Sequence, residues 1–533
     1  MQWKSYRYRH TAGGIAITQY VPETEETSVQ IPAVLEGSPV TEIGEEAFAE
    51  NGAFLERVEI PSSVKRIGDG AFKMCMSLTE LILHSGLETV GAEALYLTPV
   101  EELYLPDTVS ALGQPWELGG IRFRIDAGNP YFSTDGYGLY RKLPGTDGTE
   151  KELLVVYQPQ ERTEYVVEAG TTVIGENAVA GNPSLQEVRL PDSVHTICAA
   201  AFEGCQQLRE IVLPAGLRRI GANAFSHCIS LRSLQLPPSL EELGEYAVSD
   251  TFGWSESLNG LEQITVAEGN PVFEADAGCL YQKLFPGRAV VKYFGHGREY
   301  QIREDVTQIL PGAFRRADVR KLSVPKSVRE AGKDAFRECR HLEEIFLEES
   351  GTRLYVPGQP VYRKDEVTAL FYSPELEARR QEVSQEEIVL PEKWQVFARA
   401  PISGARRKRQ EDPYRMYVFD YRGYDGLFHT YLNLPDQYGM ALCRLKYPVL
   451  LDAEVRQGYE DFLKGHLAEI LDSIAGSHDL AHLADLAQLG FFTAENIEEA
   501  LEHFYHPGCA QEMSYLLNFK QEYLGTEEFD FSL

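Results

Sequence analysis

The sequence contains no long hydrophobic run. No stretch of about 18 apolar residues occurs, so no transmembrane helix is predicted. The basic amino-terminal residues, from Lys4 to Arg9, are not followed by an apolar core, so no secretory signal is predicted. No surface-anchor motif is present at the carboxyl end. These observations predict a cytoplasmic protein, and the alternative is the cell surface.

Motifs that mark catalytic or metal sites are also missing. The 8 cysteines include no C-x-x-C pair, and the chain has no nucleophile elbow, Walker loop, H-E-x-x-H or dinucleotide glycine fingerprint. His478 and His482, at i and i+4, could chelate zinc, but a catalytic site needs a third ligand and a general base. A solvated helix start is the preferred interpretation. We therefore expect no enzyme activity, no cofactor and no metal.

Positive charge is scarce. Lysine and arginine total 50 against 81 aspartates and glutamates, which gives a net charge of −31 and a pI near 4.9. Nucleic acid and anionic membranes are therefore unfavourable partners. A protein partner, with a basic and partly apolar segment, is expected instead; the oligomeric state is left open.

The chain does contain one recurring sequence motif, Ile67-Gly68-Asp69-Gly70-Ala71-Phe72. It returns every 23 or 24 residues within blocks of the chain. Such a fixed period is typical of a solenoid, in which each coil buries its apolar face against its neighbours. Other copies start at Ile43, Val90, Ile174, Ile197, Ile220 and Leu243, with degraded copies at Ile309 and Ala331.

One period, from Phe202 to Phe225, predicts the form of a coil. Ile211 and Leu213 are two residues apart, which indicates a short strand with both side chains pointing inward. Pro214 ends the strand because it has no N–H to donate. The spacing of three elsewhere fits turns and 3₁₀-like corners.

Four cysteines follow the repeat aromatic by three residues, in what we interpret as a small inward-facing slot. They are Cys75, Cys205, Cys228 and Cys339. A disulfide or metal site between Cys205 and Cys228, in adjacent coils, is the less favoured alternative.

This arrangement resembles the BspA-like (Treponema-type) leucine-rich repeats, with the pattern C-x-x-L-x-x-I-x-L-P-x-x-L-x-x-I-G-x-x-A-F. The match covers roughly residues 30–390. The resemblance implies a right-handed solenoid with parallel strands on a concave face and short turns or 3₁₀ segments on the convex face. Many relatives are surface proteins, which implies an adhesin or host-binding role as the alternative function.

The domain organisation follows from changes of pattern. A β-rich solenoid is expected, followed by an all-α domain. Gly-rich turns between alternating apolar residues predict β-hairpins in three longer modules. The predicted parts are a cap hairpin (1–40), the solenoid (41–400) with modules at about 126–168, 267–302 and 356–391, a basic linker (401–413), and a helical domain (414–533) of ankyrin- or HEAT-like hairpins.

The helical region gives local signals of capping. Asp452 is the predicted N-cap of one helix that continues to Ala475. Ser477 and Thr493 are the predicted N-caps of the next two helices.

The strand geometry predicts where binding occurs. Residues on either side of the inward strand residue project from the concave face, and they form an acidic ladder with apolar members. We therefore predict a non-enzymatic protein-interaction scaffold, with the helical region as a second docking site. The predicted binding residues are Arg57, Glu59, Glu80, Ile82, Glu102, Tyr104, Glu187, Arg189, Glu210, Val212, Glu344 and Phe346.

Overall fold

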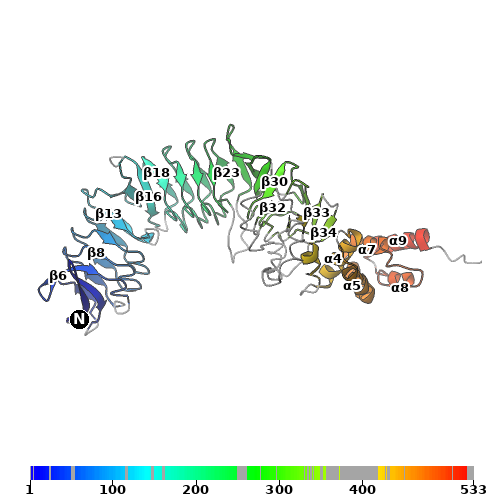
Figure 1. The fold of residues 1–533 in the computed structure, drawn as a ribbon, viewed down its shortest axis with the longest axis horizontal. Helices are drawn as coiled ribbons and strands as arrows, with labels where there is room; N and C mark the ends of the chain where they lie inside the picture. The colour runs from blue at the N-terminus through cyan, green and yellow to red at the C-terminus, as the bar shows by residue number, and fades with distance from the viewer. Residues whose placement is uncertain are drawn as a thin grey trace, which may run out of the picture. The chain divides into compact units, whose positions relative to one another are not determined.

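Each short repeat contributes two strands, which form two separate parallel ladders in the computed structural model (Figure 1). The strand predicted in each repeat builds the first, which we call the long ladder. The residues just before the repeat glycine build the second, the short ladder. The chain divides into two compact units, Met1–Asp276 and Ala277–Leu533, and both units contain both ladders.

The structure describes most of the first unit and much of the second. The predicted basic linker, 401–413, lies outside the described residues, as does nearly all of the module at 356–391. The described residues are 2–3, 5–22, 26–49, 54–114, 118–145, 149–158, 162–248, 261–276, 278–295, 297–328, 330–332, 335–336, 339, 341–348, 352–355, 371–372, 418–419, 421–426, 428, 433–448, 451–506 and 508–524.

In the first unit, equivalent residues of successive coils pair along the long ladder. Val58 pairs with Leu81, and Val188 pairs with Ile211. These central residues are buried, as the alternating pattern predicts. The strands are β4 (Ser28–Gln30), β7 (Arg57–Glu59), β9 (Glu80–Ile82), β11 (Glu102–Leu105), β13 (Arg122–Ile125), β17 (Glu164–Val166), β19 (Glu187–Arg189), β21 (Glu210–Val212), β23 (Ser233–Leu236) and β25 (Gln263–Val266).

The short ladder was not predicted, because the sequence indicated only turns and corners on that side. Its glycines allow close approach of neighbouring coils: a Cβ at Gly221 would lie 2.5 Å from the Ala199 nitrogen. The strands in the first unit are β6 (Ser38–Ile43), β8 (Arg66–Ile67), β10 (Thr89–Val90), β12 (Ala111–Leu112), β18 (Thr171–Ile174), β20 (Thr196–Ile197), β22 (Arg219–Ile220) and β24 (Glu242–Leu243).

The repeat aromatics and cysteines fill the space between the ladders. Phe202 and Phe225 stack with ring centroids 5.3 Å apart. The cysteine slot is apolar and buried as predicted, but each thiol also donates to a carbonyl of the preceding coil. Cys205 Sγ lies 3.1 Å from the Val179 oxygen, and Cys228 Sγ lies 3.2 Å from the Phe202 oxygen. All 8 cysteines are free, so the disulfide alternative is wrong.

The amino-terminal strands cover the first coil. β1 (Gln2–Trp3), β2 (Tyr6–Thr11) and β3 (Gly14–Tyr20) are antiparallel, and β3 then pairs in parallel with β6. β5 (Val34–Leu35) pairs with the start of β6. The Tyr20 ring stacks on Phe48 at 4.9 Å, which continues the aromatic column beyond the first repeat.

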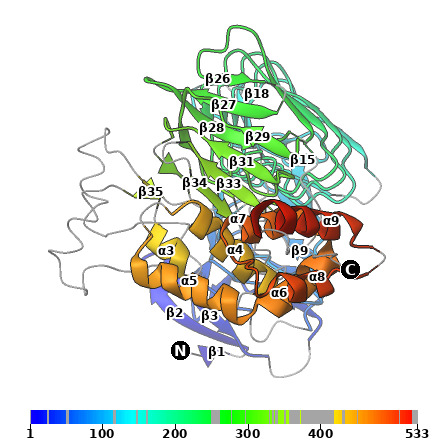
Figure 2. The ribbon, with the colours of Figure 1, turned by 90° about the vertical axis from the view of Figure 1, so that its right-hand side faces the viewer.

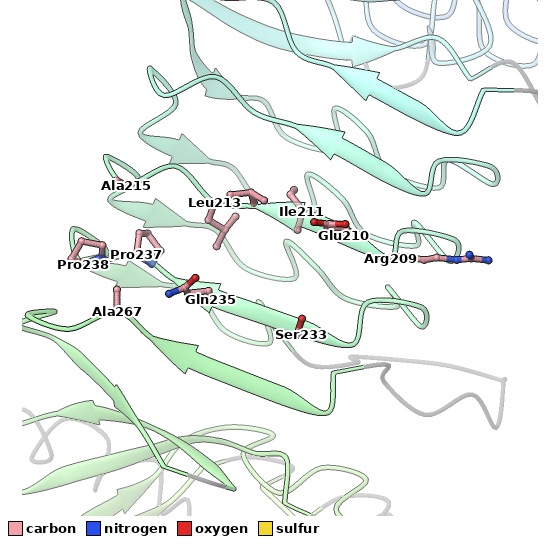
Figure 3. A pocket seen from close by; sticks show the side chains of 11 residues that line it. Arg209, Glu210, Ile211, Leu213, Ala215, Ser233, Gln235, Pro237, Pro238 and Ala267 are labelled. Carbon is pink, nitrogen blue, oxygen red and sulfur yellow. The ribbon is translucent and has the colours of Figure 1, made fainter.

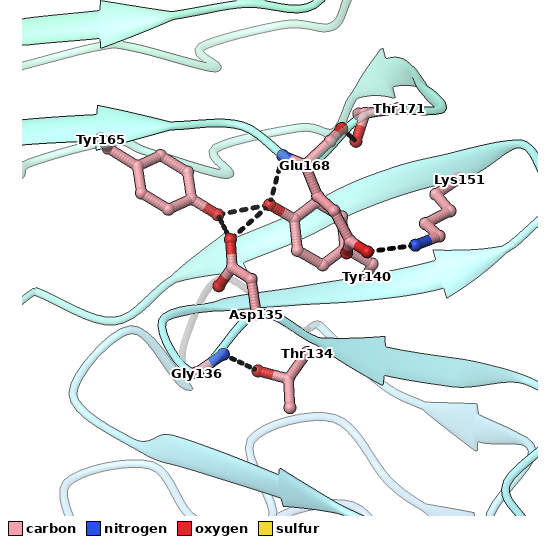
Figure 4. A network of polar contacts seen from close by, with 8 residues as sticks. All are labelled: Thr134, Asp135, Gly136, Tyr140, Lys151, Tyr165, Glu168 and Thr171. Atoms are coloured by element: carbon pink, nitrogen blue, oxygen red, sulfur yellow. Dashed lines mark hydrogen bonds and ion pairs between the residues drawn. The ribbon is translucent and has the colours of Figure 1, made fainter. Parts of the chain in front are cut away.

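Residues 126–168 contain an antiparallel meander of β14 (Phe132–Thr134), β15 (Gly138–Lys142) and β16 (Lys151–Val156). A polar network of two buried tyrosines and the exposed Asp135 joins this meander to the long ladder (Figure 4). The Tyr140 and Tyr165 hydroxyls lie 2.5 Å apart, and each donates to the Asp135 carboxylate over 2.9 Å. The Tyr140 oxygen also accepts the Glu168 N–H. The network fixes the hairpin against the strand that begins the next block of coils.

The second unit repeats this plan. β27 (Cys279–Lys283) and β28 (Arg288–Tyr293) form an antiparallel pair, and Tyr281 and Tyr300 hydroxyls lie 2.7 Å apart. Its short ladder continues from β28 through β30 (Val306–Ile309) and β32 (Glu330–Ala331). Its long ladder comprises β29 (Glu299–Gln301), β31 (Lys321–Val324), β33 (Glu344–Leu347) and the antiparallel β34 (Thr352–Tyr355). β35 (Phe371–Tyr372) pairs with β36 (Val418–Phe419).

The carboxyl-terminal part of the second unit is helical, and α7 packs between α4 and α9 (Figure 2). The described helices are α3 (Tyr421–Gly426), α4 (Leu434–Lys446), α5 (Ala453–Gly465), α6 (Leu467–Ser477), α7 (Leu480–Gln488), α8 (Ile497–Glu502), α9 (Ala510–Phe519) and the π-helical η6 (Lys520–Leu524).

The predicted helix from Asp452 to Ala475 is instead two helices. Asp452 does precede α5, but its side chain makes no capping bond. The backbone leaves the helical region at His466, with φ −118° and ψ 18°. Gly465, a poor helix former, comes directly before this break.

The two following helices begin later than predicted. Asp479, and not Ser477, caps α7 by accepting the His482 N–H at 3.2 Å. Asn496, and not Thr493, precedes α8, and its side chain accepts the Thr493 N–H at 2.7 Å. Asp479 is as good an N-cap residue as Ser477, whereas the Asn496 side chain makes no capping bond to α8.

One ion pair lies in the helical core. Arg444 donates to both oxygens of Asp425 over 2.6 and 3.0 Å, and neither side chain is appreciably exposed. The Tyr459 hydroxyl donates to the same carboxylate at 2.9 Å. This satisfied network ties α3, α4 and α5 together.

Candidate binding surface

All twelve predicted binding residues lie on the outward side of the long ladder, and none is buried. Ten of them belong to the first unit and two to the second. The more exposed members are Arg57, Glu80, Glu102, Tyr104, Arg189, Glu210 and Val212. The partly buried members are Glu59, Ile82, Glu187, Glu344 and Phe346.

The predicted acidic ladder is interrupted by ion pairs in the first block of coils. Glu80 pairs with Arg57 of the neighbouring strand at 2.9 Å, and Glu102 pairs with Arg124 at 3.3 Å. Glu59 lies 3.1 Å from the His84 ring. Such exposed pairs contribute little to stability, but the two arginines offset the charges of Glu80 and Glu102. In this block the acidic side chains therefore alternate with basic side chains that pair with them.

The Tyr104 hydroxyl also has a hydrogen-bond partner within the chain. It donates to the Asp126 carboxylate of the next coil, and this hydrogen bond lowers the pKa of Asp126. The tyrosine ring is nevertheless 43% exposed, so it offers an apolar surface with its polar end already satisfied.

The second block of coils keeps more of its negative charge. Glu164, Glu187 and Glu210 are in register on three neighbouring strands. Arg189 lies among them, 2.5 Å from Glu187, and its hydrogen bond to Glu187 raises the pKa of the guanidinium, with smaller contributions from the other two carboxylates. Glu210 forms no ion pair within the described residues.

Two exposed valines lie beside these carboxylates, one on each side of Arg189. Val166 pairs with Arg189, which in turn pairs with Val212. Val166 is 58% exposed and Val212 is 70% exposed. Isolated exposed valines are common on surfaces, but Val212 lies beside a hollow.

The hollow is a pocket of about 350 Å³ at the end of β21 and β23 (Figure 3). Figure 3 shows most of the apolar residues gathered at the strand ends, whereas Ile211, Glu210 and Ser233 lie further back along the strands. Within the described residues, no side-chain hydrogen bond engages Ser233 or Gln235. The lining residues are Arg209, Glu210, Ile211, Val212, Leu213, Ala215, Ser233, Gln235, Pro237, Pro238 and Ala267.

A second hollow of about 590 Å³ occupies the equivalent place in the first block. Two of its polar side chains are already used within the chain: His84 contacts Glu59, and Ser85 donates to Asp107 at 2.6 Å. The lining residues are Pro61, Ser62, Leu83, His84, Ser85 and Tyr104. The pocket in the second block therefore has more polar groups left for a ligand.

Sequence reasoning placed Glu210 and Val212 on this surface but missed the floor and rim of the pocket. The missed residues are those after the strand, Leu213, Ala215, Pro237 and Pro238, together with Ala267 from the following coil. The strand-ending proline was recognised only as a stop signal. Because a proline follows the strand in several coils, among them those of Pro61 and Pro237, it also lies along the edge where the two hollows form.

The surface can bind but offers little else chemically. The pocket combines a carboxylate, a guanidinium, an amide, a hydroxyl and apolar side chains, which is the composition of a protein contact surface. Among the helices that the structure describes, none has both the length and the apolar character needed to cross a membrane.

Comparison with known families gives one match. The family described as "BspA type Leucine rich repeat region" matches six copies, over residues 27–115, 160–268 and 296–356. No curated protein matches the chain.

Solved structures of bacterial leucine-rich-repeat proteins are similar in fold. A leucine rich cell surface protein from Faecalibacterium prausnitzii is 24% identical, with 65% of this chain and 75% of that chain covered and a TM-score of 0.33. A leucine-rich repeat protein from Eubacterium ventriosum is 15% identical, with 63% and 92% covered and a TM-score of 0.39. The pneumococcal vaccine antigen PcpA is 17% identical, with 62% and 95% covered and a TM-score of 0.38.

Proposed function

We propose that this chain, whose repeat array belongs to the BspA-type leucine-rich-repeat family, is a non-enzymatic scaffold that binds a partner protein. The binding surface is the outward face of the long ladder, and its centre is the pocket beside Glu210. The observation that carries this proposal is the combination of an unpaired carboxylate, an exposed valine and a free amide around one hollow.

The chemistry of the pocket defines the partner segment. An apolar side chain fits against Val212, Leu213 and Pro237, and a lysine or arginine of the same segment meets Glu210. Gln235 can hydrogen-bond the partner's backbone, since its amide both donates and accepts. The three aligned carboxylates disfavour a nucleic acid, whose phosphates they repel.

The other predicted residues extend this surface in both directions. Arg57, Glu59, Glu80, Ile82, Glu102 and Tyr104 belong to the first block, and Glu187 and Arg189 to the second. Because two glutamates of the first block are paired with arginines, we expect this block to contribute shape and apolar contact more than charge. Glu344 and Phe346 form a separate proposed contact on the second unit.

Selection of displayed random peptides on the purified full-length chain tests the proposal without knowledge of the partner. We expect enriched peptides to contain an apolar residue next to lysine or arginine. Val212→Asp and Glu210→Lys should each weaken binding of a selected peptide at least tenfold, because each loses roughly 1.4 kcal/mol or more.

Matched controls lie away from the pocket. Val34→Asp changes another exposed valine, 54% exposed on β5, and Glu241→Lys changes an exposed glutamate beside the short ladder. Both should bind like the wild type. If the pocket variants bind as well as these controls, the surface is not the binding site.

The cell-surface alternative concerns where the scaffold acts, and it stays a prediction. Treatment of intact cells with a protease separates the two locations. Loss of the protein would support a host-binding or adhesin role, and survival would support the cytoplasmic one.

A further inference from the structure

Three residues with metal-binding side chains meet where the end of α6 faces the start of α9. His478 follows α6 in the left-handed conformation, with φ 56° and ψ 41°. Cys509 is the N-cap residue of α9, and Glu512 lies in its first turn. One potential ligand atom of each residue lies within 4.8 Å of the other two. The chain thus brings together residues more than 30 positions apart.

The missing side chain of Gly508 leaves room for the His478 imidazole. A Cβ on Gly508 would lie 3.2 Å from the His478 Cε1 and 3.6 Å from its Nε2, so any larger residue would press on the ring. Cys509 and Glu512 are three positions apart, which places both side chains on one face of α9. His482, the other candidate ligand from the sequence, is held elsewhere: its Nδ1 lies 2.5 Å from the Asp479 carboxylate.

The buried carboxylate is the observation that points to a cation. Glu512 and Cys509 are each only 3% exposed. Within the described residues, the only ionic partner of Glu512 is the His478 ring at 3.6 Å, which is longer than a hydrogen bond. The helix N-terminus contributes about 0.3–1 kcal/mol, whereas burying a carboxylate costs several kcal/mol. The thiol's contact, with the Ala475 oxygen at 3.6 Å, is also weak.

The three ligand types together select one class of metal. Thiolate, imidazole and carboxylate are the ligands of tetrahedral Zn²⁺, with bond lengths of about 2.0–2.3 Å. Such bonds place ligand atoms about 3.3–3.8 Å apart, so the cluster must contract by roughly 1 Å. The His478 side chain is 57% exposed and can rotate to supply most of this movement.

We propose that His478, Cys509 and Glu512 bind one Zn²⁺, with water as the fourth ligand. On binding, the Cys509 thiol loses its proton to solvent and becomes the thiolate ligand. The ion neutralises the buried carboxylate and connects the turn between α6 and α7 to the start of α9. This site is separate from the pocket on the long ladder, and neither proposal depends on the other.

Metal titration of the purified full-length chain tests the site. Competition with the chromophoric chelator 4-(2-pyridylazo)resorcinol should show one tightly bound zinc per chain. Co²⁺ should give a thiolate-to-cobalt charge-transfer band that is absent in Cys509→Ser. The control Cys443→Ser, which removes a cysteine outside the cluster, should retain both signals.

His478→Asn keeps the test decisive if a buried variant unfolds. Its side chain is largely exposed, and asparagine tolerates the left-handed conformation. We expect this variant to keep the wild-type circular dichroism and to bind zinc at least tenfold more weakly, as should Glu512→Gln. A wild-type chain that binds no stoichiometric zinc, or a folded His478→Asn variant with unchanged affinity, would overturn the proposal.

Discussion

Two alanine substitutions in one coil should have opposite effects on stability. At Gly221 a Cβ would meet three backbone atoms of the preceding coil within 2.9 Å, the nearest being the Ala199 nitrogen at 2.5 Å. Because backbone atoms cannot rotate away, the coils must separate, and overpacking of this kind costs about 1–3 kcal/mol. The entropic gain of replacing glycine offsets about 0.4–1 kcal/mol of this. Gly221→Ala should therefore destabilise the array by about 1–2 kcal/mol.

Gly216→Ala is the matched control. Gly216 is exposed in a turn closed by the Leu217 N–H and the Pro214 oxygen, and its new Cβ would approach only the Asp192 oxygen, at 3.7 Å. Since its φ is not in the left-handed region, alanine should stabilise this turn by about 0.4–1 kcal/mol.

Hydrogen–deuterium exchange of peptides that cover these coils measures both effects locally. We expect faster exchange in Gly221→Ala and equal or slower exchange in Gly216→Ala. Equal protection in the two variants would refute the close-approach explanation of the repeat glycine.

Three further predictions follow from buried polar groups. Burial raises the pKa of the Cys205 thiol to about 12, so iodoacetamide at pH 8 should leave it unmodified in the folded chain, and mass spectrometry would detect any labelling. Burial also raises the pKa of Tyr165, because the folded chain favours the neutral phenol. The folded state therefore keeps its full stability below the unfolded pKa of about 10, and it loses stability as the pH rises above that value. Tyr165→Phe should reduce the loss of stability in alkaline denaturation, while costing about 1–2 kcal/mol at pH 7. Arg444→Leu should destabilise the helical region by about 3–5 kcal/mol, because it leaves the Asp425 carboxylate buried without its cation; urea unfolding measures this, and wild-type stability would contradict it.

Much of the fold could be predicted because one coil specifies the next. The alternation around Ile211 fixed the inward face of the strand, and the period of 23 residues fixed which residues neighbour each other. The short ladder was missed because two extended residues before a glycine give no period of their own. The break at His466 was missed because the apolar stripe of the predicted helix continues across it.

The candidate site was only partly predictable. Strand alternation placed Glu210 and Val212 on the outer face, since side-chain direction depends only on local sequence. The ion pair between Glu80 and Arg57 depends on the pairing of neighbouring coils. An alignment of the repeats, which places the two residues at equivalent positions, could have predicted it. The pocket needs Ala267, whose coil follows the preceding one by 263 − 233 = 30 residues instead of 23. No periodicity predicts its position.

The central claim is that a partner segment lies across the pocket beside Glu210. Site-specific photocrosslinking tests this most directly, with benzoylphenylalanine placed at Val212 or, as the control, at Val34. The selected peptide should crosslink from position 212, and it should not crosslink from position 34. Crosslinking from position 34 alone, or with equal yield from both, would contradict the account.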